Sequence, residues 1–296
     1  MTFPGADDFA RPCVSSITSG GHRIVLLTAD GVRVEAAHQP GPPPSGKGPR
    51  PPAVVLAHGF TGALDRPALR RAAGVFAQYT GVITFSFRGH GRSGGHSTVG
   101  DREVLDLAAA VGWARRLGYE RVATVGFSMG GSVALRHGGL YLPETGREHA
   151  GRTGAHADMV VSVSAPARWF YRGTAPMRRL HWAVTRPAGR AVARWALRTR
   201  VHSGEWDPVP VPPVAAVPSI APRRVLIVHG DRDPYFPLDH PRALAAAGEP
   251  SSTELWIEPG FGHAEAAAPD ALMRRIARWV VEGRVPRPHP FTGSWG

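Results

Sequence analysis

The sequence has almost no cysteine and almost no lysine. Cys13 is the only cysteine, which excludes an intrachain disulfide and a metal site built from several thiolates. Lys47 is the only lysine, so arginine carries nearly all of the positive charge behind the formal net charge of +12. An excess of positive charge is typical of proteins that bind nucleic acid or an anionic membrane. We favour the simpler explanation that the genome prefers arginine codons. No zinc-finger spacing or aromatic–basic RNA-binding motif is present, so nucleic-acid binding is not expected.

Long apolar runs and a leader-like start are also missing. No apolar stretch approaches the roughly 20 residues of a membrane-spanning helix. The first sixteen residues lack a basic segment followed by an apolar one, which predicts no secretory signal peptide. Apolar residues still make up 43% of the 296 residues, enough for a large core. The expectation is a soluble cytoplasmic protein of undetermined oligomeric state.

Strand-like and helix-like stretches alternate along most of the chain. Alternating apolar residues on either side of Asp30–Gly31 predict a hairpin of His22–Leu27 and Val32–Ala37. The further predicted strands are Ala53–Ala57, Val82–Phe87, Arg121–Val125, Met159–Ser164, Val225–His229 and Glu254–Ile257. The predicted helices are Pro67–Tyr79, Val104–Leu117, Gly130–His137 and Ala271–Glu282. This alternation favours one α/β domain over residues 1–296, with a mainly parallel sheet covered by helices on both faces.

Two regions interrupt the alternation. Residues 166–220 separate two predicted strands, and we interpret them as a cap or lid inserted into the domain. Residues 283–296, GRVPRPHPFTGSWG, are rich in proline and glycine and predict an irregular tail.

The stretch VATVGFSMGGSVAL places a serine, Ser128, between glycines at the junction of a predicted strand and a predicted helix. A sharp strand-to-helix turn holds its central residue in a strained conformation, and bulky flanking residues would collide with it. Gly126, Gly130 and Gly131 supply the room. The following helix directs its first amides toward negative charge that develops beside the serine. Ser128 is therefore the candidate nucleophile.

A serine hydroxyl needs a base and a group that orients the base. His263 follows the last predicted strand, and Asp233 follows the strand before it, so both fall at the carboxyl edge of a parallel sheet. Asp231 is the rival acid, and we assign it instead to holding the turn through backbone amides. The order Ser128, Asp233, His263 is the one that this strand–turn–helix architecture uses.

The negative oxygen formed during acyl transfer needs two preorganised donors. We assign one to the backbone N–H of Met129, directly after the candidate nucleophile. The second is assigned to the backbone N–H of Phe60, in the loop VVLAHGFTG after an earlier strand. His58 in the same loop is interpreted as structural.

The motifs HGFTG, FRGHGRS, GFSMGG, HGDRDPYFP and GFGH resemble those of the α/β-hydrolase superfamily. The likeness runs from about Arg23 to Trp279 and is greatest to the small-capped esterases, including feruloyl-esterase-like and monoacylglycerol-lipase-like groups. It implies the α/β-hydrolase fold with an eight-stranded, mostly parallel sheet, the triad Ser128–Asp233–His263 and a cap at residues 166–220. GFSMGG is also similar to the cofactor-free perhydrolases. Ser86 departs from the acidic residue that many relatives carry before RGHG.

Charged residues in FRGHGRSGG have a structural interpretation. Arg88, His90 and Arg92 could bind an anion, but a supporting turn beside the oxyanion loop is favoured. Glu103 and Asp106, on the predicted helix nearby, are expected to be the charged partners of this turn.

The predicted insertion is strongly basic. Residues 159–204 contain nine arginines and no acidic residue, and Arg186, Arg190, Arg194 and Arg198 would form one stripe if that stretch were a single helix. Five aromatic residues are interleaved with the arginines: Trp169, Phe170, Tyr171, Trp182 and Trp195. A solvated helix with its aromatic side on the core is slightly favoured. The alternative is a lid that recruits anionic or aromatic substrates, or that rests on a lipid surface.

Together these features predict a serine hydrolase that cleaves a small-molecule carboxylic ester through an acyl-enzyme at Ser128, with no metal or organic cofactor. The same residues could serve a thioesterase, an acyltransferase or a perhydrolase. A catalytically silent homologue that binds a small ligand is the alternative from another class. The natural substrate and the acyl chain length stay open.

Overall fold

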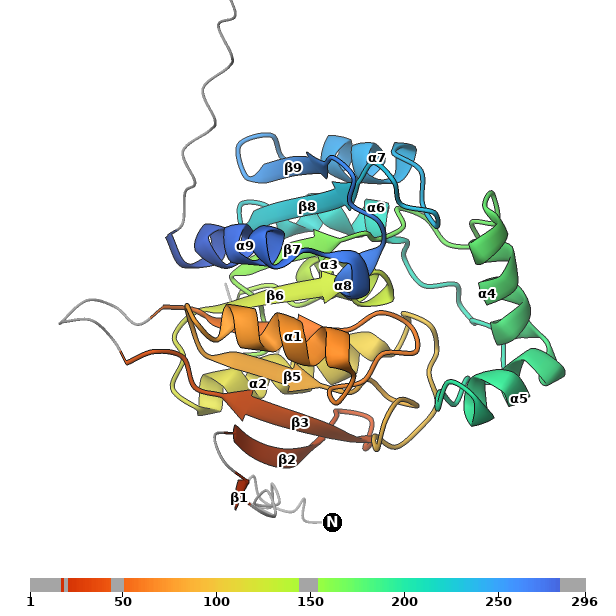
Figure 1. Cartoon of the computed structure of the whole chain (residues 1–296), viewed down its shortest axis with the longest axis horizontal. Helices are drawn as coiled ribbons and strands as arrows, with labels where there is room; N and C mark the ends of the chain where they lie inside the picture. Colours follow the sequence, from red (N-terminus) through yellow and green to blue (C-terminus); the bar gives the residue numbers. More distant parts are fainter. Residues whose placement is uncertain (1–16, 19–20, 44–50, 144–153, 283–296) are drawn as a thin grey trace, which may run out of the picture.

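The computed structural model describes residues 17–18, 21–43, 51–143 and 154–282 (Figure 1). Cys13, Lys47 and the predicted tail at 283–296 lie outside these ranges. No helix within the described residues is both long and apolar enough to cross a bilayer.

One twisted sheet organises the described chain. Its strands follow the order β1-β2-β3-β5-β4-β6-β7-β8-β9. They are β1 (Ile17–Thr18), β2 (Gly21–Leu27), β3 (Arg33–Gln39), β4 (Ala53–Ala57), β5 (Val82–Phe85), β6 (Val122–Phe127), β7 (Met159–Val163), β8 (Arg224–Gly230) and β9 (Thr253–Glu258). The strands from β5 to β9 in this order are parallel, and β1, β2 and β3 are antiparallel. The eight predicted strands are all present in a mostly parallel sheet, and the two-residue β1 extends its edge.

Helices cover both faces of this sheet (Figure 1). The helices are α1 (Pro67–Phe76), α2 (Glu103–Arg116), α3 (Met129–Leu140), α4 (Ala175–Thr185), α5 (Pro187–Trp195), α6 (Pro213–Ala216), the 3₁₀ helix η1 (Val217–Ile220), α7 (Asp239–Ala247), α8 (Ala264–Ala267) and α9 (Asp270–Glu282). Helices α1 and α9 share one apolar core with one face of the sheet, and α2 and α3 share a second core with the other face. Because both faces are covered, every residue of β4, β6 and β7 is buried, which accounts for their continuous apolar sequences.

A buried ion pair supports the turn that follows β5. The guanidinium of Arg88 donates to Asp106 at 2.8 Å and to Asp30 at 2.7 Å. The Arg88 and Asp106 side chains are only 3% and 0% exposed. Glu103 accepts hydrogen bonds from the backbone N–H groups of Thr98 and Gly100. The acidic residues of α2 therefore hold this turn and the loop after it, as predicted.

Residues 168–204, here called the α4–α5 segment, leave the body of the protein between β7 and β8. Figure 1 shows α4 and α5 beyond the ends toward which the parallel strands point. Helix α6 and η1, still within the predicted insertion, instead pack against α3, and Val217 and Ile220 belong to the core. At the start of the α4–α5 segment, the Tyr171 ring packs edge-on against the His240 ring, with ring centroids 4.5 Å apart.

The predicted stripe of four arginines is not a single helical row. Arg186 is extended, with φ −98° and ψ 141°, and separates α4 from α5. Arg190 and Arg194 lie in α5, whereas Arg198 lies beyond its end with φ 55°. Pro187 explains the break, because the residue before a proline is pushed out of the helical region.

Candidate active site

Ser128 stands at the junction between β6 and α3. Its backbone has φ 52° and ψ −115°, a conformation that costs energy for any residue with a side chain. A Cβ on Gly126 would lie 2.1 Å from the Gly130 carbonyl oxygen, and one on Gly130 would lie 2.2 Å from the Ala57 carbonyl oxygen. The crowding predicted around this turn is therefore present, and it comes from backbone atoms that cannot move aside.

Three side chains from three loops meet at this turn. The hydroxyl of Ser128 lies 2.9 Å from Nε2 of His263, and Nδ1 of His263 lies 2.7 Å from Oδ2 of Asp233. An ionised carboxylate can only accept, so this network assigns the imidazole proton to Nδ1 and leaves Nε2 to accept from the serine. The Asp233 side chain is 1% exposed and that of His263 is 15% exposed. A relay from hydroxyl to imidazole to carboxylate is thus assembled.

The two aspartates of HGDRDPYFP have different partners. Oδ1 of Asp233 accepts from the backbone N–H groups of Tyr235 at 2.8 Å and Phe236 at 3.1 Å, which leaves Oδ2 for His263. Asp231 instead accepts from the backbone N–H of Gly260 at 2.7 Å. Asp231 therefore ties the β8 loop to the β9 loop, and the structure brings Asp233 and not Asp231 to the histidine.

The loop after β4 passes directly against the serine. A Cβ on Gly59 would lie 3.4 Å from Cβ of Ser128. His58 Nδ1 bonds to the Gly59 carbonyl at 2.7 Å, and His58 Nε2 accepts from the Phe87 N–H at 3.0 Å. Burial and the neighbouring His90 lower the pKa of His58 to about 3, so its imidazole is neutral. His58 is therefore a structural support, as its sequence position suggested.

Met129 and Phe60, the two candidate oxyanion donors, lie in segments next to Ser128. Met129 is the first residue of α3, so its backbone N–H has no acceptor within the helix. Phe60 follows Gly59 in the loop that touches Ser128, and its ring packs edge-on against His90 at 5.8 Å. Both amides therefore belong to segments that adjoin the serine.

Two further side chains contact this site, and the sequence did not single them out. Tyr235 stacks on the imidazole of His263, with ring centroids 4.2 Å apart. Glu265 accepts from the backbone N–H of Gly59 at 3.1 Å, and burial raises the pKa of this carboxyl. Tyr235 lies two residues after Asp233 and Glu265 two residues after His263, which is the only sequence signal that could have found them.

The described residues contain no cluster of three or more histidine, cysteine, aspartate or glutamate side chains arranged to hold a metal ion.

The fold agrees with comparisons to known proteins. A model of the alpha/beta hydrolase family matches residues 54–279, so the chain belongs to the alpha/beta hydrolase family. No curated protein matches the chain.

Solved structures share the fold at low sequence identity. An esterase from Pyrococcus furiosus is 19% identical, with a TM-score of 0.63 over 91% of this chain and 97% of the other. A serine hydrolase without a lid from Xanthomonas campestris is 18% identical, with a TM-score of 0.56 over 92% and 98%. A Butyrivibrio proteoclasticus protein with bound ferulic acid is 17% identical, with a TM-score of 0.52 over 87% and 96%.

Proposed function

We propose that this protein is a serine hydrolase that cleaves carboxylic esters through an acyl-enzyme at Ser128. The observation that carries the proposal is the continuous relay from Ser128 through His263 to Asp233, with distances of 2.9 and 2.7 Å. Such a relay makes a hydroxyl nucleophilic, because proton loss and bond formation occur together.

In the first half of the reaction, Oγ of Ser128 attacks the acyl carbonyl and Nε2 of His263 takes the hydroxyl proton. Asp233 holds the imidazole through Nδ1 and stabilises the imidazolium that forms. The tetrahedral oxyanion accepts hydrogen bonds from the N–H groups of Met129 and Phe60. His263 then returns the proton to the leaving alkoxide, and the alcohol departs.

In the second half, water occupies the place that the alcohol has left. His263 takes a proton from this water, the hydroxide attacks the acyl carbon, and the same two amides receive the second oxyanion. Collapse of this intermediate returns the proton to Ser128 and releases the acid. No step needs a metal ion or an organic cofactor.

An ester is the substrate class with most support. The Pyrococcus furiosus protein that shares this fold is described as an esterase, and an alkoxide is a leaving group that one imidazolium can protonate. Thioester cleavage and acyl transfer use the same relay, but no observed contact favours either over an ester.

A fluorophosphonate probe tests the proposal, because it reacts only with an activated serine. The wild-type protein should be labelled at Ser128, as mapped by mass spectrometry, and should hydrolyse p-nitrophenyl acetate. Ser128→Ala should lose both properties. Ser132→Ala is a matched control, since Ser132 is a buried serine in the helix that follows Ser128 and its hydroxyl has no hydrogen-bond partner among the described residues.

An outcome against the proposal is equally specific. A folded wild-type protein that resists the probe and hydrolyses no acyl ester would favour a silent ligand-binding homologue.

A further inference from the structure

The α4–α5 segment exposes large apolar side chains. No residue of α4 is buried, and in α5 only Gly189 and Ala193 are buried. Trp195 is 78% exposed, Val192 48% and Trp182 47%. Exposed apolar side chains grouped on a surface indicate a contact surface, so Trp182, Val192 and Trp195 are not explained by packing on the core.

The charge of the segment is of one sign. Residues 159–204 hold nine arginines and no aspartate or glutamate. Within the described part of the chain, only Arg168 among these nine forms an ion pair, with Asp239. The other eight guanidinium groups form no ion pair within the described residues, which favours an anionic partner.

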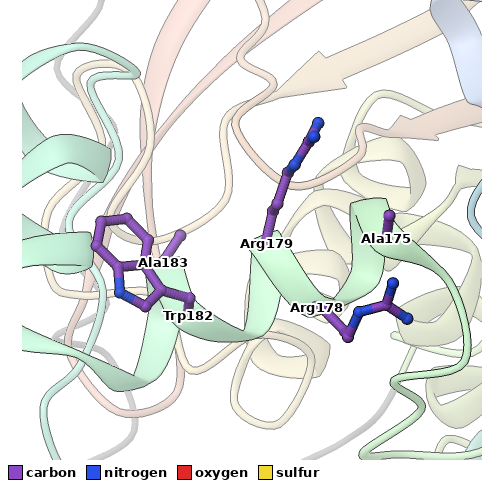
Figure 2. Close-up of a pocket in the computed structure, with 5 residues that line it drawn as sticks. All are labelled: Ala175, Arg178, Arg179, Trp182 and Ala183. Atoms are coloured by element: carbon purple, nitrogen blue, oxygen red, sulfur yellow. The ribbon is translucent and has the colours of Figure 1, made fainter.

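An open hollow of about 570 Å³ is lined by five residues that all come from α4, and Figure 2 shows their side chains. They are Ala175, Arg178, Arg179, Trp182 and Ala183. The lining surface is mainly apolar and two of its five residues are arginines, a combination that suits an acyl chain or glycerol next to a phosphate.

A second and more polar hollow of about 460 Å³ lies beside α5. It is lined by His96, Arg190, Ala191, Arg194, Trp195, Arg200 and Val201. The guanidinium of Arg194 lies 5.4 Å from the centre of the Trp195 ring. Exposed tryptophan beside arginine, without acidic residues, is the composition of helices that lie at a lipid–water interface.

We propose that the α4–α5 segment docks on the surface of a bilayer that contains anionic phospholipid. Arginine side chains bind lipid phosphates there, and Trp182 and Trp195 insert their rings between the headgroups. A second copy of the chain is the weaker candidate for this surface, because two such segments would bring unneutralised arginines together. The segment lies beyond the strand ends that carry Ser128, so docking would place the site near the lipid (Figure 1).

Vesicle sedimentation of the full chain tests this proposal. The Ser128→Ala variant is used so that no lipid is hydrolysed, and the result does not depend on the proposed activity. Binding is expected to vesicles of phosphatidylcholine with 30% phosphatidylglycerol at low salt. It should fall at 0.5 M NaCl and be weak on phosphatidylcholine alone, because salt and neutral lipid both remove the attraction.

Matched variants locate the surface. The triple variant Arg178→Gln, Arg179→Gln, Arg194→Gln should weaken vesicle partitioning by on the order of a hundredfold, since each arginine near such a surface contributes roughly fivefold. The double variant Trp182→Ala, Trp195→Ala should also weaken vesicle binding. The blue shift of tryptophan emission that is expected when the wild-type rings enter the lipid should be lost in this variant. The control variant replaces three exposed arginines outside the segment by glutamine, and it should bind vesicles as the parent protein does. These arginines are Arg116, Arg121 and Arg278.

Three results would overturn the proposal. They are no binding to phosphatidylglycerol vesicles at low salt, an equal loss in the control, and tryptophan variants that change self-association in light scattering but not vesicle binding.

Discussion

Mutations of Asp233 and Asp231, which are separated by one residue, should have different consequences. Asp233→Asn should lower kcat on an ester by about 10⁴-fold, because an amide cannot hold the required imidazole tautomer or stabilise the imidazolium. The fold should persist, since the asparagine oxygen can still accept from the amides of Tyr235 and Phe236. Asp231→Ala should keep most of kcat but lose the bond to Gly260, at a cost of about 1 kcal/mol.

Steady-state kinetics and urea unfolding of both variants separate these effects. A catalytic collapse of Asp231→Ala with near-normal turnover of Asp233→Asn would reverse the two assignments. The sequence could predict that Ser128, Asp233 and His263 meet, because each follows a predicted strand in a fixed order. It could not identify Glu265, whose partner Gly59 is 206 residues away and is reached only through the fold.

At the scale of secondary-structure elements, the approach of α3 to β4 and β6 depends on two glycines. Alanine at Gly126 or Gly130 would place a methyl group 2.1 or 2.2 Å from a carbonyl oxygen of the neighbouring backbone. The helix must then move off the sheet, which should cost about 1–3 kcal/mol or more and displace Ser128 from His263. Urea unfolding and ester turnover should both deteriorate.

Gly74→Ala is the matched control in another helix, α1. A Cβ there meets no atom within 4 Å, so alanine should stabilise the fold by about 0.5–1 kcal/mol through its better helix propensity and leave turnover unchanged. Similar effects of all three alanines would show that the close packing of α3 is not what positions the serine.

The burial of each helix and strand explains which of them the sequence could predict. The strands and α1, α2, α3 and α9 have long apolar patterns that pack on the sheet, so their periodicity is visible. Helices α4 and α5 have almost nothing buried, so no core-facing pattern marks them. The sequence signal left in this region is the recurrence of arginine every four residues. Pro187 divides this stretch into two helices, so the recurrence does not form one helical row.

At the scale of the whole molecule, buried histidines couple stability to pH. Burial is the main cause that lowers the pKa of His58 and His137 to about 3 and that of His240 to about 4. The ordinary value of about 6.5 applies once the chain unfolds. Between these values the unfolded chain binds protons that the native protein does not bind, so acid favours unfolding.

The free energy of unfolding should therefore be largest above about pH 6.5 and should decline as the pH falls toward 4. Each of the three histidines contributes a slope of up to about 1.4 kcal/mol per pH unit. Urea unfolding at pH 7, 6 and 5 measures this slope. His137→Phe preserves a ring that can stack on Tyr141, whose ring centroid is 4.6 Å away, but removes the titrating group. Its slope should therefore be smaller than that of the wild type by up to about 1.4 kcal/mol per pH unit. A stability that does not change between pH 7 and 5, or a slope unaltered in His137→Phe, would contradict the assignment of neutral buried histidines.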